Sequence, residues 1–170
     1  GHAPLLVSMP HVGTAIPDDL RDGFVPRALA TEDADWHLAT LYDFLGELGA
    51  SVLQPHYARY VIDLNRPPDD TPMYPGASNT ELCPTRFFTG EPLYREGAAP
   101  DSAEQLRRRQ CYWQPYHDGY VHHRKAQKNM GMLNYIHNQR SKRTYIDLRD
   151  SDLQSQSYMQ CGHGASLHCV

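Results

Sequence analysis

Proline is confined to one part of this chain of 170 residues, and this limits where helices and strands can form. All 13 prolines lie within residues 1–120, so most regular elements there must fit between two prolines. The same residues include nine arginines, 17 acidic residues and no lysine, a net charge of −8. Residues 121–170 have three lysines, four arginines and three aspartates, a net charge of +4. We therefore interpret residues 121–170 separately from the first 120.

Length and composition exclude several classes of protein. The chain is long enough for one domain with its own hydrophobic core. No run of about 18 apolar residues is present, so the sequence predicts no membrane span. The first residues lack a basic and apolar leader, which favours a cytoplasmic location. The four cysteines include no Cys-x-x-Cys pair, which argues against a disulfide scaffold.

Apolar patterning in the first 120 residues predicts an α/β fold with helices covering a sheet. Residues 4–8, 51–54 and 57–64 are short apolar runs typical of strands. Residues 67–100, rich in proline, read as a long loop of the kind that often binds ligands. Two longer segments, about 31–49 and 103–123, have the spacing of helices.

The two predicted helices have recognisable boundaries and buried faces. Thr31 is a suitable cap for the first helix, and Gly49 is a suitable end. Pro115 lies inside the second pattern and predicts a kink there. The apolar residues expected to face the core are Trp36, Leu38, Leu41, Tyr42, Leu45 and Leu48 in the first helix, and Leu106, Tyr112, Trp113 and Tyr116 in the second.

Two residues of the first segments are candidate metal ligands. His11 follows the first predicted strand, between Pro10 and Gly13, at the sheet edge where α/β proteins bind ligands. A neutral imidazole held in such a loop is a good zinc ligand, although it could also be an ordinary loop histidine. Asp35 lies close to two other acids, where a cation would offset their repulsion. The alternative for Asp35 is simple negative charge at a helix N-terminus.

Polar residues also follow the third predicted strand. Asn65 and Arg66 come directly after it, on the sheet edge expected for His11. The guanidinium of arginine matches a carboxylate, and asparagine can donate to a polarised carbonyl. The alternative is that Arg66 forms an ordinary surface ion pair with Asp63. Cys83 is a nucleophile on paper, but no histidine lies near it in sequence, so we expect it to be inert.

Taken together, these segments resemble the N-formylglutamate deformylase (N-formylglutamate amidohydrolase) family of histidine degradation. The blocks that carry the resemblance occur in order over residues 4–117. They are PLLVSMPHVGT (4–14), DADWH (33–37), LYDF (41–44), ARYVIDLNRPP (58–68), LCPT (82–85), GEPLY (90–94) and YWQPYH (112–117). The resemblance implies a three-layer αβα sandwich of the zinc-carboxypeptidase and aspartoacylase type (phosphorylase/hydrolase-like).

The resemblance also implies a reaction and a site. The reaction is hydrolysis of the formamide bond of N-formyl-L-glutamate, a small-molecule substrate, to formate and glutamate. Zn²⁺ or another divalent metal would be held by His11 and Asp35. Asn65 and Arg66, with Arg59 as a weaker candidate, would bind a carboxylate of the substrate. No catalytic base is identified, because in the family it lies in the second half, and residues 121–170 match no block and contain no glutamate.

We therefore expect a partial domain over residues 4–120 and an unmatched basic tail over residues 121–170. The tail has four explanations: an appended basic segment, a cloning artefact, a change of reading frame in a truncated family member, or chance. A second functional hypothesis is a non-catalytic fragment or pseudoenzyme whose tail binds a polyanion. Sparse aromatic residues in the tail favour a solvated segment, so we do not expect nucleic-acid binding. The sequence leaves the oligomeric state open.

Overall fold

A four-stranded sheet forms the centre of the computed structural model, which describes residues 1–3, 5–72, 79–128, 134–137 and 168–169. The strand order is β3-β1-β2-β4. Strand β1 pairs in parallel with both β2 and β3, and β4 is antiparallel to β2. The strands are β1 (Leu5–Ser8), β2 (Ser51–Gln54), β3 (Asn134–His137) and β4 (His168–Cys169). The predicted strands at residues 4–8 and 51–54 are therefore confirmed.

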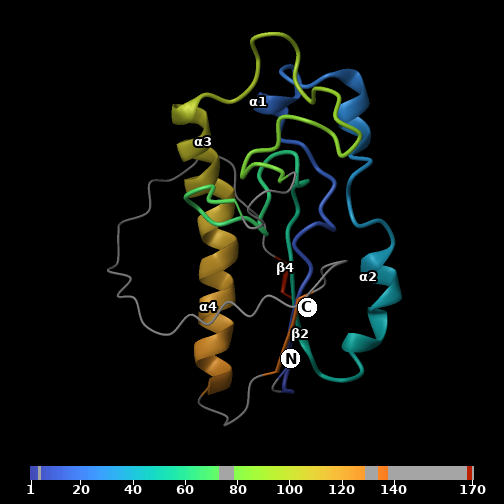
Figure 1. Cartoon of the computed structure of the whole chain (residues 1–170). Helices are drawn as coiled ribbons and strands as arrows, with labels where there is room; N and C mark the ends of the chain where they lie inside the picture. The colour runs from blue at the N-terminus through green and yellow to red at the C-terminus, as the bar shows by residue number, and fades with distance from the viewer. Residues whose placement is uncertain (4, 73–78, 129–133, 138–167, 170) are drawn as a thin grey trace.

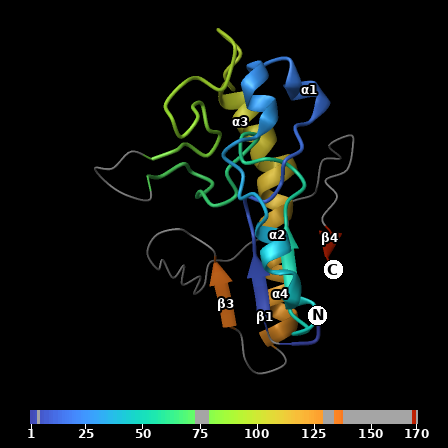
Figure 2. The same ribbon diagram turned by 90° about the vertical axis from the view of Figure 1, so that its right-hand side faces the viewer.

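Helices lie on both faces of this sheet (Figures 1 and 2). The α-helices are α1 (Asp18–Arg21), α2 (Leu38–Leu41), α3 (Ser102–Arg108) and α4 (Gln114–Lys128). Two 3-10 turns are η1 (Pro26–Ala30) and η2 (Asp43–Leu45), and the π-helical turn η3 (Arg109–Trp113) joins α3 to α4. Figure 1 shows α2 on one side of the strands and the α3–α4 helix on the other. No helix among the described residues is long and apolar enough to span a membrane.

Alternation along the strands explains the two covered faces. Successive strand side chains point to opposite faces of a sheet. Leu6 and Leu53 pack in a cluster with Tyr116 of α4, whereas Val7 packs in another cluster with Leu45, next to α2. Both faces are therefore buried, and the predicted α/β class is confirmed. The finer assignment to a zinc-carboxypeptidase-like sandwich stays a prediction.

The helix predicted over residues 31–49 is largely wrong. Thr31 has a left-handed backbone (φ 47°) and ends η1 instead of capping the predicted helix, and the α-helix begins only after His37, which is also left-handed (φ 63°). Backbone hydrogen bonds to distant segments hold residues 31–37, for example from Asp35 N to His11 O at 2.9 Å. Three side chains expected in the core are exposed instead: Trp36, Leu41 and Leu48.

The strand predicted over residues 57–64 is also wrong, although its burial is confirmed. The segment turns, with a hydrogen bond from Val61 N to Ala58 O at 2.9 Å. Only Tyr57 keeps a strand-like contact, an isolated bridge to Ala15. The apolar side chains enter two different core clusters, Ala58, Tyr60 and Val61 in one and Ile62 and Leu64 in the other. An apolar run indicates burial, but the turn was decided by the surroundings of the segment.

The second predicted helix is confirmed, with a modification at Pro115. A proline inside an α-helix lacks an N–H and clashes with the carbonyl four residues earlier. Here the helix widens to a π-helical turn, η3, just before Pro115. Tyr116 is buried as expected, whereas Leu106 is exposed, contrary to prediction. Within 67–72 and 79–100 the structure has no helix or ladder strand, which agrees with the predicted loop.

Candidate functional site

His11 lies just beyond the carboxyl end of β1, as predicted. Strand β1 ends at Ser8, and Met9 N still bonds to Leu53 O at 2.9 Å, so the chain leaves the sheet directly before His11. The side chain is buried, with a total exposure of 7%. Its Nε2 is 2.8 Å from Oδ1 of Asp63. This contact fixes one ring nitrogen and turns the other, Nδ1, toward a different partner.

Gly13 is required by a close backbone approach rather than by a ligand. A Cβ at this position would lie 2.3 Å from Tyr57 O and 2.8 Å from Pro55 O. The chain after β1 therefore runs directly against the chain after β2, where Ala15 N bonds to His56 O at 3.2 Å. The glycine lets two segments at the sheet edge approach each other.

Asp35 is brought to His11 by its own backbone. Its N–H donates to His11 O at 2.9 Å, and its Oδ2 lies 3.8 Å from His11 Nδ1. The Asp35 side chain is partly open to solvent, at 36% exposure. It lies in a turn before α2, not in the first turn of a helix. The predicted pairing of His11 with Asp35 is therefore present, although the local structure that produces it differs from the prediction.

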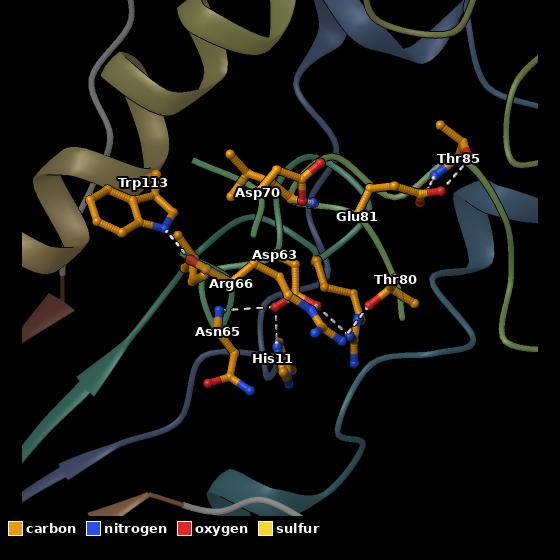
Figure 3. A network of polar contacts seen from close by, with 12 residues as sticks. His11, Asp63, Asn65, Arg66, Asp70, Thr80, Glu81, Thr85 and Trp113 are labelled. Carbon is orange, nitrogen blue, oxygen red and sulfur yellow. Dashed lines mark hydrogen bonds and ion pairs between the residues drawn. The ribbon is translucent and has the colours of Figure 1, made fainter. Parts of the chain in front are cut away.

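Asp63 is the residue at the centre of the site, and the sequence analysis did not select it (Figure 3). Its side chain is only 1% exposed, yet it is charged. Burial raises the pKa of Asp63, but the hydrogen bond and charge of His11 and the charge of Arg59 outweigh burial and hold this pKa well below its usual range. The available signal was its position, since it ends an apolar run and has an arginine four residues before and three residues after it.

Two arginines neutralise this buried carboxylate. Arg59 Nη2 donates to Asp63 Oδ2 at 2.5 Å, and its guanidinium lies 4.5 Å from the ring centre of Phe88. Arg66 Nε is 3.9 Å from the same oxygen, and Arg66 Nη2 donates to Thr80 Oγ1 at 2.8 Å. The alternative of a surface ion pair between Asp63 and Arg66 is wrong, because Asp63 is fully buried.

Arg66 keeps unused hydrogen-bonding capacity. Its Nε and Nη1 are buried and have no hydrogen-bond partner among the described residues. A buried guanidinium nitrogen without a partner is costly, so an anion would be favoured beside it. Arg59 differs, because its contacts already go to Asp63 and the ring of Phe88. Of the two arginines, Arg66 is the one with unsatisfied donors among the described residues.

The donors present fit part of a metal site. A histidine that binds a metal with one nitrogen usually donates its other N–H to a carboxylate, which is the arrangement of His11 and Asp63. On a tetrahedral zinc two ligand atoms lie roughly 3.3 Å apart. His11 Nδ1 and Asp35 Oδ2 are 3.8 Å apart, close to that separation. The described residues contain no group of three or more potential metal ligands.

Cys83 has the properties of an inert thiol, as expected. It is a free cysteine and is 2% exposed. Burial raises the pKa of Cys83 to about 11. A thiol with this pKa has almost no thiolate near neutral pH, and the thiolate is the nucleophile.

Comparison with known proteins gives a family assignment. A model of the N-formylglutamate amidohydrolase family matches residues 3–158. The chain belongs to this family. The match extends past residue 120, where we predicted the end of the partial domain. That boundary stays a prediction. Residues 138–167 of the predicted basic tail lie outside the described residues.

Two curated relatives are N-formylglutamate deformylases. The protein of Pseudomonas putida is 52% identical over 117 residues, which cover 69% of this chain and 43% of the relative. The protein of Pseudomonas aeruginosa is 53% identical over 117 residues, covering 69% and 44%. The chain thus spans less than half the length of these relatives.

Solved structures support the fold. The crystal structure of N-formylglutamate amidohydrolase from Ralstonia eutropha matches with a TM-score of 0.65 and 25% identity, over 79% of this chain and 51% of that one. A gene product of Agrobacterium tumefaciens matches with a TM-score of 0.58 and 19% identity, over 80% and 51%. The second match carries information on the fold alone.

Proposed function

We propose that this chain carries the substrate-binding edge of an enzyme that hydrolyses the formamide bond of N-formyl-L-glutamate. Membership of the family supports the reaction, and the geometry supports the location of the substrate-binding site. The observation that carries the proposal is the convergence on Asp63. His11 Nε2 and Arg66 Nε both contact this buried carboxylate, and Asp35 lies beside the other nitrogen of His11. Three segments distant in sequence therefore meet at one edge of the sheet.

Arg66 is the proposed partner of a glutamate carboxylate. Its Nε and Nη1 are buried without a hydrogen-bond partner among the described residues, and Thr80 holds its Nη2. An anion there would satisfy these donors and gain charge-assisted hydrogen bonds. Asn65 N donates to Asp63 Oδ1, the oxygen that also contacts His11 (Figure 3), and the side-chain amide of Asn65 is the second proposed partner of the substrate. Arg59, the weaker candidate, balances the charge of Asp63 in this proposal.

His11 and Asp35 are the residues that would hold a divalent metal, Zn²⁺ being the expected one. Such an ion lowers the pKa of bound water toward 7 and so supplies hydroxide at neutral pH. Asp63 would keep the His11 ring in one orientation and one tautomer through the bond to Nε2. A third ligand and a general base are expected from the family beyond residue 120, and both stay predictions.

The proposed reaction consumes one water and releases formate and L-glutamate. The water oxygen bonds to the formyl carbon, the bond from that carbon to nitrogen breaks, and the nitrogen takes up a proton. Arg66 and Asn65 contribute by holding the substrate in a fixed position, which lowers the entropic part of the barrier. The proposal does not depend on two other predictions from the sequence, the three-layer sandwich fold and the cytoplasmic location.

The test is formate release from N-formyl-L-glutamate by the purified 170-residue chain, with Zn²⁺ and after chelation. We expect release that chelation abolishes and added metal restores. Arg66→Gln should raise KM for the substrate, whereas Arg21→Gln, an exposed arginine in α1, should leave it unchanged. A chain that binds zinc but releases no formate contradicts hydrolysis by this form.

A non-catalytic member of the family is the second candidate. The observation in its favour is that the described residues provide only the two adjacent donors His11 and Asp35, and no group of three. This candidate expects L-glutamate to bind with an affinity reduced by Arg66→Gln, and no turnover. Of the predicted basic tail, residues 121–128 form the end of α4, and residues 129–133, 138–167 and 170 lie outside the described part, so the binding of a polyanion stays a prediction.

A further inference from the structure

Two ring side chains of the long helix contact the backbone of the substrate-binding segment. Trp113 Nε1 donates to Arg66 O at 2.9 Å (Figure 3), and His117 Nε2 lies 3.0 Å from Leu64 O. Residues four apart on a helix lie on the same face, so the two rings reach the segment together. Their carbonyl partners flank Asn65 on both sides.

The chemistry of these contacts fixes their direction. A backbone carbonyl only accepts hydrogen bonds, so His117 must carry its proton on Nε2 to bond to Leu64 O. The indole N–H of Trp113 is likewise only a donor. The helix therefore supplies two N–H groups to two carbonyls that are two residues apart.

The two rings also stabilise each other's orientation. Their centres are 3.8 Å apart with planes at 27°, a stacked pair. Trp113 is the last residue of the π-helical turn η3, which accommodates Pro115. Single π-helical turns are uncommon and occur frequently at functional sites. The stack holds both donors at a fixed spacing in front of the segment.

The other polar groups of the same segment are bonded to Asp63. Asn65 N donates to Asp63 Oδ1 at 2.9 Å, the oxygen that also contacts His11. Arg66 N donates to the backbone oxygen of Asp63 at 3.1 Å. The backbone N–H groups of residues 65 and 66 are thus bonded to Asp63, and the backbone carbonyls of residues 64 and 66 are bonded to the rings of Trp113 and His117.

We propose that Trp113 and His117 are positioning residues that fix the backbone of residues 64–66 and thereby aim the side chains of Asn65 and Arg66. The consequence for catalysis rests on the function proposed above, whereas the consequence for the backbone does not. Loss of either N–H leaves a carbonyl unpaired and loosens the segment. The expected functional effect is on substrate binding, because neither ring is placed at the reacting atoms.

The first experiment needs no substrate. It measures amide hydrogen exchange at Asn65 and Arg66 by NMR in the full chain, with the Val7 amide in β1 as a reference for global opening. Trp113→Phe and His117→Phe keep an aromatic ring but lose the donor, and His117→Gln keeps a donor of similar reach. Tyr112→Phe, next to Trp113 in η3, removes a hydroxyl whose hydrogen-bond partner is Arg107, and is the matched control.

Loss of one such hydrogen bond should accelerate exchange at Asn65 and Arg66 by about tenfold, and the Val7 amide, which reports global opening, should accelerate by no more than that factor. His117→Gln should restore most of the protection, and Tyr112→Phe should have no effect at these two amides. Exchange unchanged in both Trp113→Phe and His117→Phe would overturn the proposal. A second result would also overturn it: slower exchange at Asn65 and Arg66 in His117→Phe than in His117→Gln. The ring of residue 117 would then act by packing alone.

The second experiment measures hydrolysis of N-formyl-L-glutamate by the same variants. The proposal expects KM to rise about tenfold in Trp113→Phe with kcat nearly unchanged, since uniform binding is lost. A fall in kcat with KM unchanged would contradict a positioning role. If the unsubstituted chain shows no turnover, the proposed function fails, while the exchange rates still decide the role of the two rings.

Discussion

Residues 57–66 and residues 36–48 are both rich in aromatic and aliphatic side chains, but the structure uses them in opposite ways. The first segment has no regular structure, yet every residue of it from Ala58 to Leu64 is buried. The second contains α2 and η2, yet Trp36, Leu41 and Leu48 are more than half exposed. Apolar composition alone therefore indicates neither regular structure nor burial.

The difference lies in what each segment packs against. Residues 58–64 lie between two core clusters and are also bonded by polar groups from the rest of the chain, such as Arg108 Nη1 to Val61 O at 3.1 Å. Residues 36–48 have a neighbour on one side only, where Leu38, Tyr42 and Leu45 meet the sheet. The first segment is held by tertiary contacts on all sides, and the second only by one apolar stripe.

The largest expected effect on stability comes from the buried carboxylate of Asp63 in the first segment. Asp63→Asn leaves the guanidinium of Arg59, itself 10% exposed, without a counter-charge. Loss of one partner of a buried ion pair should lower the free energy of unfolding by about 3–5 kcal/mol. Urea denaturation measures this, and Asp69→Asn, an exposed carboxyl in the following loop, should leave the midpoint unchanged. Equal midpoints for the two variants would contradict the structural role of Asp63.

A pair of leucines tests the one-sided packing of the second segment. Leu45 is 4% exposed and Leu41 is 68% exposed. Leu45→Ala should lower the free energy of unfolding by about 2–5 kcal/mol because it leaves a cavity against the sheet. Leu41→Ala should change it by less than about 0.5 kcal/mol. A large cost at Leu41 in urea denaturation would mean that a partner covers this face in solution.

The helix arginines test how the first segment is held from outside. Arg108 is 2% exposed and donates to Val61 O and to Tyr94 Oη. Arg108→Lys loses the planar group that spans these acceptors and should lower the free energy of unfolding by about 1.5–3 kcal/mol. Arg107→Lys, in the more exposed pair with Glu104, should lower it by less than about 1 kcal/mol. Thermal or urea denaturation that ranks the two variants the other way would refute this account.

The smallest expected effect is an acid dependence through Glu104. Burial raises the pKa of Glu104, but hydrogen bonds from Arg107 and Arg108 outweigh burial, and the net pKa lies below its ordinary value of 4.5. Because the folded pKa is depressed, this carboxylate stabilises the fold above pH 4.5, and the contribution is lost as the pH falls below that value. Glu104→Gln should reduce the drop in urea midpoint between pH 7 and pH 3.5. An unchanged drop would show that other carboxylates account for it.

The sequence was a good guide to those features that depend on local pattern. Strands 5–8 and 51–54, the long second helix and the candidate ligand His11 were all predicted from apolar runs, spacing and position after a strand. The family blocks also named Asp35, Asn65 and Arg66, and the structure brings these near His11 and Asp63. Their roles stay predictions. Asp63 was missed because a carboxylate beside two arginines looks the same in sequence whether it is exposed or buried.

What the sequence determined by itself was the first two strands, the long second helix, the burial of residues 58–64 and the family. Only the tertiary structure decided that residues 57–64 turn instead of extending, that Thr31 and His37 interrupt the first helix, and that Asp63 is buried. The physical reason is that each of these depends on hydrogen bonds or charges supplied by distant segments. Leu82 O holds the amide of Asp63, and His11 O holds that of Asp35. Such partners are set by the fold, and local propensity cannot anticipate them.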